Sequence, residues 1–206
     1  RENYTEIEQS IVLHNAADPD FFKSNKNKKH NSIVFLGNTN RFNQSRGIGQ
    51  VISWWSDEYL KENYTLEIIG GTKQESENLK NTINKLNVSD YITVSPWIDR
   101  KGAAKKLSES TIGLLINSPD NDHSYLFTSP LKYFEYLLSE LSIIAVDFPS
   151  HRSLPFNEKI VFFENGNKKD FINSLKMLSS VKPLTRDEKY IISLESRAKK
   201  LIDFIY

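Results

Sequence analysis

The chain has 206 residues, with 27 basic and 26 acidic side chains and a formal net charge of +1. This balance gives no electrostatic argument for nucleic acid as a partner. The absence of cysteine excludes disulfides, thiolate catalysis, zinc–thiolate sites and iron–sulfur clusters. Apolar runs fall far short of the ~20 residues that cross a bilayer. The first residues, RENYTEIEQS, show no secretory signal.

Short apolar runs alternate along the chain with segments of helical period. Strands are predicted at residues 11–13, 33–36, 66–69, 91–94, 112–116, 143–146 and 160–163. Helices are predicted at residues 47–63, 77–86, 102–108, 130–140, 170–178 and 185–205. Strands separated by helices of this length are typical of parallel βαβ crossovers. The sequence therefore predicts an α/β fold, with a Rossmann-like, doubly wound and mainly parallel sheet of about six strands.

The loops that follow the strands are candidate ligand sites, because open α/β sheets bind ligands beyond the carboxyl ends of their strands. One such loop, GNTNRFNQSRG, carries Arg41 and Arg46 just before a predicted helix. Two guanidinium groups in this position can hold a phosphate. The alternative is two solvated arginines in a surface loop. The loop has neither a GxGxxG nor a Walker pattern.

The helix predicted at residues 130–140 begins with a second candidate site. Ser129 and Pro130 are predicted as its N-cap and first residue. Lys132 stands where a capping box has Glu, and a cation there opposes the helix dipole. A bound anion would reverse that effect, because the amides of Leu131 and Lys132 and the positive helix end suit a diphosphate. The alternative is a well-capped core helix with solvated Lys132 and Glu135.

A third loop, NSPDNDHSYLF, holds Asp120, Asp122 and His123. These side chains can contact a polyhydroxyl ligand, or they belong to a plain polar loop. No two of the four histidines have the spacing of metal ligands, so no metal site is expected. There is no GxSxG nucleophile elbow and no basic run interleaved with aromatic residues.

The stretch TSPLKYFEYLLSELSIIAVDFPSHR, residues 128–152, resembles the nucleotide-sugar-binding signature of retaining glycosyltransferases of family 4. GNTNRFNQSRGIGQVI resembles that family's Gly…Lys-Gly loop, with Arg46 and Gly47 in the Lys-Gly position. LEIIGG, YITVSPWID and VLHNAADPDFF are similar to three further family motifs. The motifs keep their order and spacing over about residues 11–178.

This resemblance implies the C-terminal, donor-binding half of a GT-B enzyme, without the acceptor-binding N-terminal half. Residues 1–30 would be an interdomain linker segment and first strand, and residues 31–206 a nucleotide-sugar-binding domain with a long C-terminal helix. The enzyme would transfer a hexose, with retention, from a nucleoside-diphosphate sugar to a glycan or lipid-linked acceptor in bacterial surface polysaccharide synthesis. The expected location is cytoplasmic, with peripheral membrane contact of the full-length enzyme left open. No metal or other cofactor is expected, and the fragment alone is expected to be inactive.

The resemblance also implies roles for individual residues. Arg46, Lys132 and the helix amides would stabilise the departing diphosphate, and Glu135 would accept hydrogen bonds from the ribose hydroxyls. Further donor contacts are expected at Gly37, Asn38, Arg41, Ile98, Thr128, Ser129, Pro130 and Leu131.

The sequence departs from the family pattern in its acidic pair. The family has two glutamates eight positions apart; Glu135 matches the second, and Phe127 takes the place of the first. Asp120 and Asp122 are the nearest candidates to replace the lost acid.

A second departure lies in the first loop. Asn38 stands where the family has Arg, and Arg41 is a candidate replacement across a longer loop. Two alternative functions stay open: a nucleotide-sugar epimerase of the same fold, and a non-catalytic module that binds nucleotides or glycans.

Overall fold

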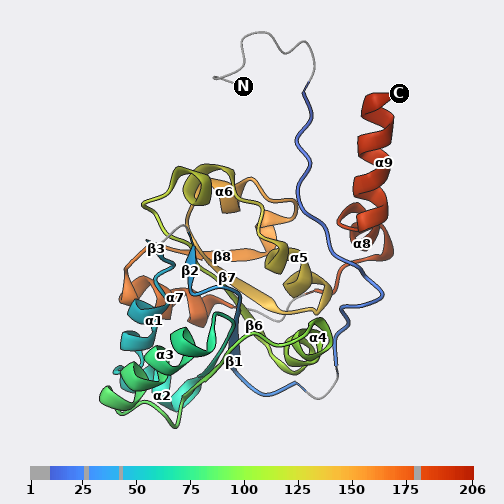
Figure 1. Cartoon of the computed structure of the whole chain (residues 1–206). Coiled ribbons are helices and arrows are strands. Elements are labelled where there is room, and N and C mark those ends of the chain that lie inside the picture. Colours follow the sequence, from blue (N-terminus) through green and yellow to red (C-terminus); the bar gives the residue numbers. More distant parts are fainter. Residues whose placement is uncertain (1–9, 26–27, 42–43, 179–181) are drawn as a thin grey trace.

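The computed structural model describes residues 10–25, 28–41, 44–178 and 182–206, and six strands of these ranges form one parallel sheet (Figure 1). The strand order is β5-β4-β1-β6-β7-β8. The strands are β1 (Ser32–Leu36), β4 (Thr65–Ile69), β5 (Ile92–Ser95), β6 (Ile112–Leu115), β7 (Ser142–Val146) and β8 (Ile160–Phe163). Every pair of neighbours in the order runs parallel, which confirms the predicted doubly wound α/β fold.

Helices cover both faces of this sheet. On one face, Ile33 and Phe35 of β1 pack into a core with α1 (Ile48–Trp54), α2 (Glu58–Asn63), α3 (Lys73–Lys85) and α7 (Lys168–Met177). On the other face, Val34 and Leu36 pack against α4 (Arg100–Glu109) and α5 (Leu131–Leu138). Successive residues of a strand point to opposite faces, so β1, buried along its whole length, contributes to both cores.

The remaining elements lie in the loops and at the end of the chain. They are the hairpin of β2 (Asn40–Arg41) and β3 (Gln44–Ser45), a π-helix at His123–Phe127, α6 (Pro149–Arg152), a 3₁₀ helix at Asn157–Lys159, α8 (Arg186–Ile191) and α9 (Leu194–Ile205).

The direction of winding reverses between β1 and β6. From β1 the chain adds β4 and β5 on one side, and it then adds β6, β7 and β8 on the other side. The carboxyl ends of β1 and β6 therefore border the crevice at which open α/β sheets bind their ligands.

Two predicted helices are each divided in two by a side-chain cap. The prediction of one helix over residues 47–63 is wrong because Asp57 caps α2, accepting a hydrogen bond from the Tyr59 N–H at 3.1 Å. The helix predicted over residues 185–205 divides at Ser193, which caps α9 through the Ser196 N–H. A capping side chain satisfies the open amides of a helix start, so a new helix begins at each of these residues.

The N-terminal segment forms no strand over residues 11–13, contrary to the prediction. Residues 12–16 lie beside the start of α9, with which they line a small cavity (Figure 1). In the described part of this segment, the β-type pairing is an isolated bridge between Ala17 and Ser193. A strand needs a neighbouring strand for its main-chain groups, and this segment lies against helices instead.

The helix α5 is held against the sheet by a tyrosine that packs onto a glycine. Tyr136 is fully buried, and its hydroxyl accepts a hydrogen bond from the Leu36 N–H at 3.0 Å. A Cβ atom on Gly113 of β6 would lie 2.3 Å from the Tyr136 ring. Because protein interiors are close-packed, only glycine at this position allows α5 to approach the sheet so closely.

We expect Gly113→Ala to lower the free energy of unfolding by about 1–3 kcal/mol, because the added methyl group overpacks the contact with Tyr136. Gly49→Ala is the matched control, since nothing lies within 4 Å of a Cβ at that position of α1. It should stabilise the chain by up to about 1 kcal/mol through helix propensity. Urea unfolding measures both values, and equal changes in the two variants would contradict the packing argument.

Candidate functional site

A lysine side chain lies across the main chain at the end of β1. Gly37, the first residue after β1, has a φ angle of +139°, and a Cβ there would meet Cε and Nζ of Lys132 at 2.0 Å. Lys132 belongs to the first turn of α5, on one face of the sheet. Its ammonium group therefore reaches over the carboxyl edge of the sheet, and two of the predicted site residues meet there.

Arg46 brings a second cation to the same edge from the loop that leads into α1. Its Cζ lies 5.9 Å from the centroid of the Phe35 ring, and Nζ of Lys132 lies 6.0 Å from that centroid. The Arg46 Nε donates to Oδ1 of Asn117 at 2.9 Å. Its Nη1 donates to the Asn38 carbonyl at 3.4 Å. The site thus gathers residues from both strands that border the crevice.

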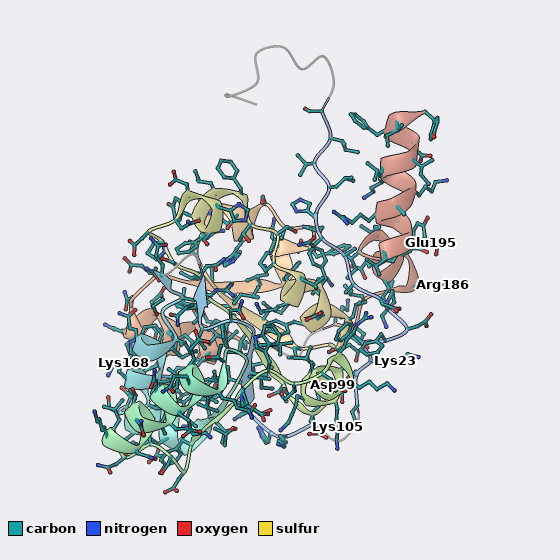
Figure 2. All side chains as sticks on the ribbon, viewed as in Figure 1. Lys23, Asp99, Lys105, Lys168, Arg186 and Glu195 are labelled. Carbon is teal, nitrogen blue, oxygen red and sulfur yellow. The ribbon has the colours of Figure 1, made fainter. Side chains whose placement is uncertain are left out.

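Arg46 is a buried charge. Of the Lys, Arg, Asp and Glu residues whose burial the structure describes, it alone is buried, with 5% of its surface exposed. Charged side chains such as Asp99, Lys105 and Glu195 lie on the outside of the molecule (Figure 2). Removing a charge from water costs several kcal/mol. The guanidinium of Arg46 therefore depends on hydrogen-bond acceptors in the protein, and the Asn117 side chain and the Asn38 carbonyl are two of them.

The start of α5 has no side-chain cap. Pro130 is the N-cap, which corrects the prediction that Ser129 caps this helix. The Ser129 hydroxyl instead accepts a hydrogen bond from the Asn15 main-chain N–H at 2.9 Å, and the Ser129 carbonyl accepts one from the Asn15 side chain. A helix start carries open amides and a partial positive charge. Together with Lys132, it makes this end of α5 attractive to an anion.

Glu135 is the acidic residue of this helix start. It is half-buried, one turn beyond Lys132. Burial raises the pKa of its carboxyl group, although the charges of Lys132 and Arg100 oppose that shift. A partly desolvated carboxylate is stabilised by hydrogen-bond donors. Hydroxyl groups of a ligand suit it for that reason.

The other predicted contact residues differ in their exposure to solvent. Thr128 is buried, whereas Leu131 is 48% exposed. Ile98 is half-buried and packs against the core beneath α4 and α5. Arg41 lies in β2, but its side chain is outside the described residues.

The loop between β6 and α5 carries the remaining candidates. Phe127 is 71% exposed, so the position that corresponds to a glutamate in the family the sequence resembles carries an accessible phenyl ring. Asp120, Asp122 and His123 are also exposed. The Gln44 side chain donates to the Asp120 carbonyl at 3.3 Å, which joins the β2–β3 hairpin to this loop.

Within the described ranges, no group of three or more His, Asp or Glu side chains has the arrangement of a metal site. In those same ranges, no helix combines the length and apolar character that crossing a membrane requires.

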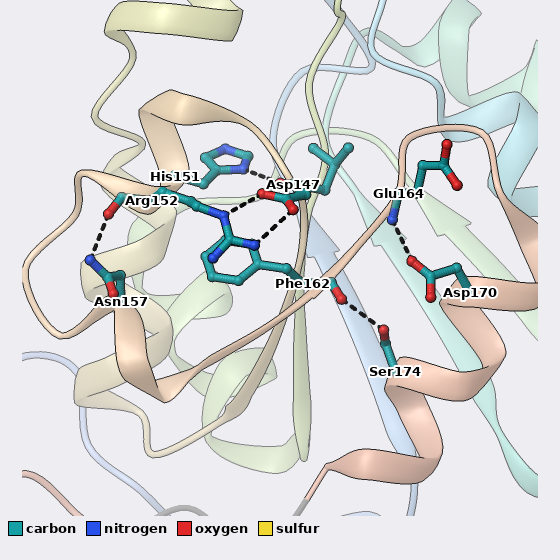
Figure 3. A network of polar contacts seen from close by, with 9 residues as sticks. Asp147, His151, Arg152, Asn157, Phe162, Glu164, Asp170 and Ser174 are labelled. Atoms are coloured by element: carbon teal, nitrogen blue, oxygen red, sulfur yellow. Dashed lines mark hydrogen bonds and ion pairs between the residues drawn. The ribbon is translucent and has the colours of Figure 1, made fainter.

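A buried histidine lies at the carboxyl end of β7 (Figure 3). Nδ1 of His151 is 2.8 Å from the Val146 carbonyl oxygen, and its ring stacks on Phe148. Beside it, Asp147 accepts two hydrogen bonds from the Arg152 guanidinium, at 2.6 and 2.7 Å. Burial lowers the pKa of His151 to about 4, so the ring is neutral at physiological pH.

No protein-family model and no curated protein sequence matches the chain, but solved structures do. Sucrose-phosphate synthase from Thermosynechococcus elongatus superposes with a TM-score of 0.74 at 13% identity, over 99% of this chain and 55% of the synthase. HepE from Anabaena, solved with UDP and glucose, gives 0.70 at 9% identity, over 95% and 56%. The lipopolysaccharide outer core galactosyltransferase WaaB gives 0.64 at 14% identity, over 95% and 55%.

The chain has the fold of a GT-B glycosyltransferase domain. At identities of 9–14%, the likeness shows the fold alone. The chain spans about half the length of the solved structures it matches.

Two residues that were not predicted from the sequence as site residues also lie at the site. Asn117 binds Arg46, and the signal for it was a polar residue that ends the apolar run of β6 at the ligand-binding edge. Trp97 is 58% exposed, and its indole N–H donates to Oδ1 of Asn38 at 3.1 Å. An exposed aromatic residue after β5 carries no comparable signal in the sequence.

We expect the stability of the chain to fall as the pH is lowered from about 6.5 to 4. Over this range the unfolded chain binds a proton at residue 151 and the folded chain does not, because the folded pKa is lowered to about 4. At pH 4, His151 should account for a loss of about 3 kcal/mol in the free energy of unfolding. His151→Asn, which retains a donor for the Val146 carbonyl, should remove this part of the pH dependence.

Urea unfolding at several pH values measures the effect. The control is His30→Asn, because His30 is exposed and its replacement should leave the pH profile of the parent chain in place. Parallel profiles for the parent and His151→Asn would contradict the assignment.

Proposed function

We propose that the chain is the nucleoside-diphosphate-sugar-binding half of a glycosyltransferase. The observation that carries the proposal is the meeting of Arg46 and Lys132 at the carboxyl end of β1. Two cations beside an uncapped helix start suit a group that carries more than one negative charge. HepE, which shares the fold, was solved with UDP and glucose, and this supports a donor of the same class.

The chemistry follows from the charge that develops during transfer. The bond between the anomeric carbon of the donor sugar and the diphosphate oxygen breaks, and a bond to the acceptor oxygen forms as the proton of the acceptor hydroxyl passes to an oxygen of the departing diphosphate. Negative charge grows on the departing diphosphate. Arg46, Lys132 and the start of α5 stabilise that charge, and preorganised groups of this kind act more strongly in the transition state than in the ground state.

Glu135 orients the nucleotide in this proposal. Its half-buried carboxylate lies on the same helix start as Lys132 and accepts hydrogen bonds from the ribose hydroxyls. The contact fixes the position of the donor along the crevice without taking part in bond breaking. In this scheme the side-chain cations and the helix start provide the positive charge, with no metal ion.

The proposal for the whole enzyme goes further. A hexose is transferred with retention, as in family 4, to a glycan or lipid-linked acceptor that the other half of the enzyme holds. We place this reaction in bacterial surface polysaccharide synthesis, on the cytoplasmic side of the membrane. The similarity in fold to WaaB, a lipopolysaccharide outer core galactosyltransferase, supports this assignment.

A non-catalytic nucleotide- or glycan-binding module is the second candidate, and Phe127 favours it. The phenyl ring is 71% exposed where the family has an acid that contacts the sugar. The two candidates differ in turnover: the full-length enzyme should release UDP from a UDP-sugar in the presence of acceptor. A binding module would bind the same donor without releasing UDP.

We expect Arg46→Met to weaken UDP binding by about 1.5–3 kcal/mol and to leave uridine binding within about 0.5 kcal/mol. The variant keeps the apolar length of the buried side chain and removes the charge-assisted hydrogen bonds to phosphate. Calorimetry with UDP and uridine on the same preparation measures both affinities.

Arg186→Met is the control for loss of one cation, because Arg186 is exposed on α8 (Figure 2). It should leave the UDP affinity unchanged. If Arg46→Met weakens UDP and uridine binding equally, the phosphate role of Arg46 is wrong.

Glu135→Gln should weaken UDP binding by about 1–3 kcal/mol at neutral pH, because neutral hydrogen bonds to ribose replace charge-assisted ones. As the pH falls through the raised pKa of Glu135, the parent carboxyl becomes protonated and its advantage over the variant should disappear. The ratio of the two affinities isolates this effect from the titration of UDP itself. A ratio of one at every pH would overturn the ribose assignment.

A further inference from the structure

Asn117 holds the buried guanidinium of the proposed donor site. It is the second residue after β6 and is 2% exposed. Its Oδ1 accepts the Nε–H of Arg46 at 2.9 Å. On the β1 side, the Asn38 carbonyl accepts the Arg46 Nη1–H at 3.4 Å. The plane of the guanidinium is thereby fixed by groups that follow the two central strands.

Both of these acceptors are neutral. A carboxylate is the usual partner of a buried arginine, and it would cancel the positive charge as it oriented the group. An amide oxygen makes the same hydrogen bond without adding a negative charge. The contact with Asn117 therefore orients Arg46 without neutralising its positive charge.

The other end of the Asn117 amide supports this interpretation. Its Nδ2 is buried and has no hydrogen-bond partner among the described residues. A buried donor without an acceptor destabilises the fold. An aspartate would have no such donor and would pair with Arg46 more strongly. At position 117 an asparagine is thus expected to stabilise the fold less than an aspartate. Its presence fits a position where a neutral acceptor is required.

We propose that Asn117 is a positioning residue that orients Arg46 toward the diphosphate of the donor and preserves its charge, so that the site selects a doubly charged diphosphate over an uncharged nucleoside. This inference rests on the proposed function. It assigns to Asn117 the selectivity of the site for the anionic part of the ligand.

Asn117→Asp is the decisive variant because it keeps the acceptor oxygen and changes the charge. It should raise or preserve the melting temperature, since the new carboxylate pairs with the buried Arg46. It should also weaken UDP binding by about 10- to 100-fold, the range that corresponds to one charge-assisted hydrogen bond, and leave uridine binding unchanged. A purely structural role predicts the same melting temperature but an unchanged UDP affinity.

Asn117→Ala and Asn121→Asp complete the experiment. Asn117→Ala removes the acceptor, so it should lower the melting temperature and also weaken UDP binding more than uridine binding. Asn121→Asp adds the same charge to the same loop, where the Asn121 side chain accepts the Ser124 N–H. It should change UDP affinity less than threefold, as expected for a screened charge.

The outcomes distinguish the two proposals. If the parent chain binds neither UDP nor GDP in calorimetry, the proposed function is wrong and this inference falls with it. If the parent chain binds UDP and Asn117→Asp binds it equally well, the inference is overturned and the proposed function stands. Equal losses in Asn117→Asp and Asn121→Asp would likewise overturn it, because charge in the loop alone would then explain the effect.

Discussion

A guanidinium buried where the sheet reverses its winding is the constraint on which the site depends. Arg46 loses most of its contact with water at the carboxyl ends of β1 and β6. Protein dipoles must replace that water, because an unsolvated charge is strongly destabilising. The Asn117 oxygen and the Asn38 carbonyl are two such dipoles, one following each strand. These hydrogen bonds compensate Arg46 for the lost water, and they also join the two halves of the sheet at the ligand-binding edge.

Close approach of main chain and side chains is the second constraint. Gly113 lies under the ring of Tyr136, and Gly37 lies under the end of Lys132. A Cβ on Gly70 would meet the Gly37 carbonyl oxygen at 2.2 Å. Without side chains at these three positions, α5 and the ends of β1 and β4 come close together. The start of α5, Arg46 and Lys132 therefore lie at the same edge of the sheet, and both cations lie within about 6 Å of the Phe35 ring centroid.

The sheet was predictable from the sequence because parallel strands buried on both faces are continuous apolar runs. The runs at residues 112–116 and 143–146 are of this kind, and the structure confirms both. The helix breaks at Asp57 and Ser193 were missed because apolar periodicity continues on both sides of each cap. The strand predicted at residues 11–13 was wrong because an apolar run does not reveal whether a partner strand is present.

The alternation of the six sheet strands with helices was predictable from local sequence patterns, as was the position of Arg46, Lys132 and Glu135 in segments that follow strands. These features depend on residues close together in the chain, whose periodicity and turn chemistry are local. The burial of Arg46 against Asn117, and the binding of Ser129 to Asn15 in place of a cap on α5, emerged from the folded structure. Those contacts depend on distances between remote segments. Such distances are set by how the helices pack on the sheet, which no local pattern specifies.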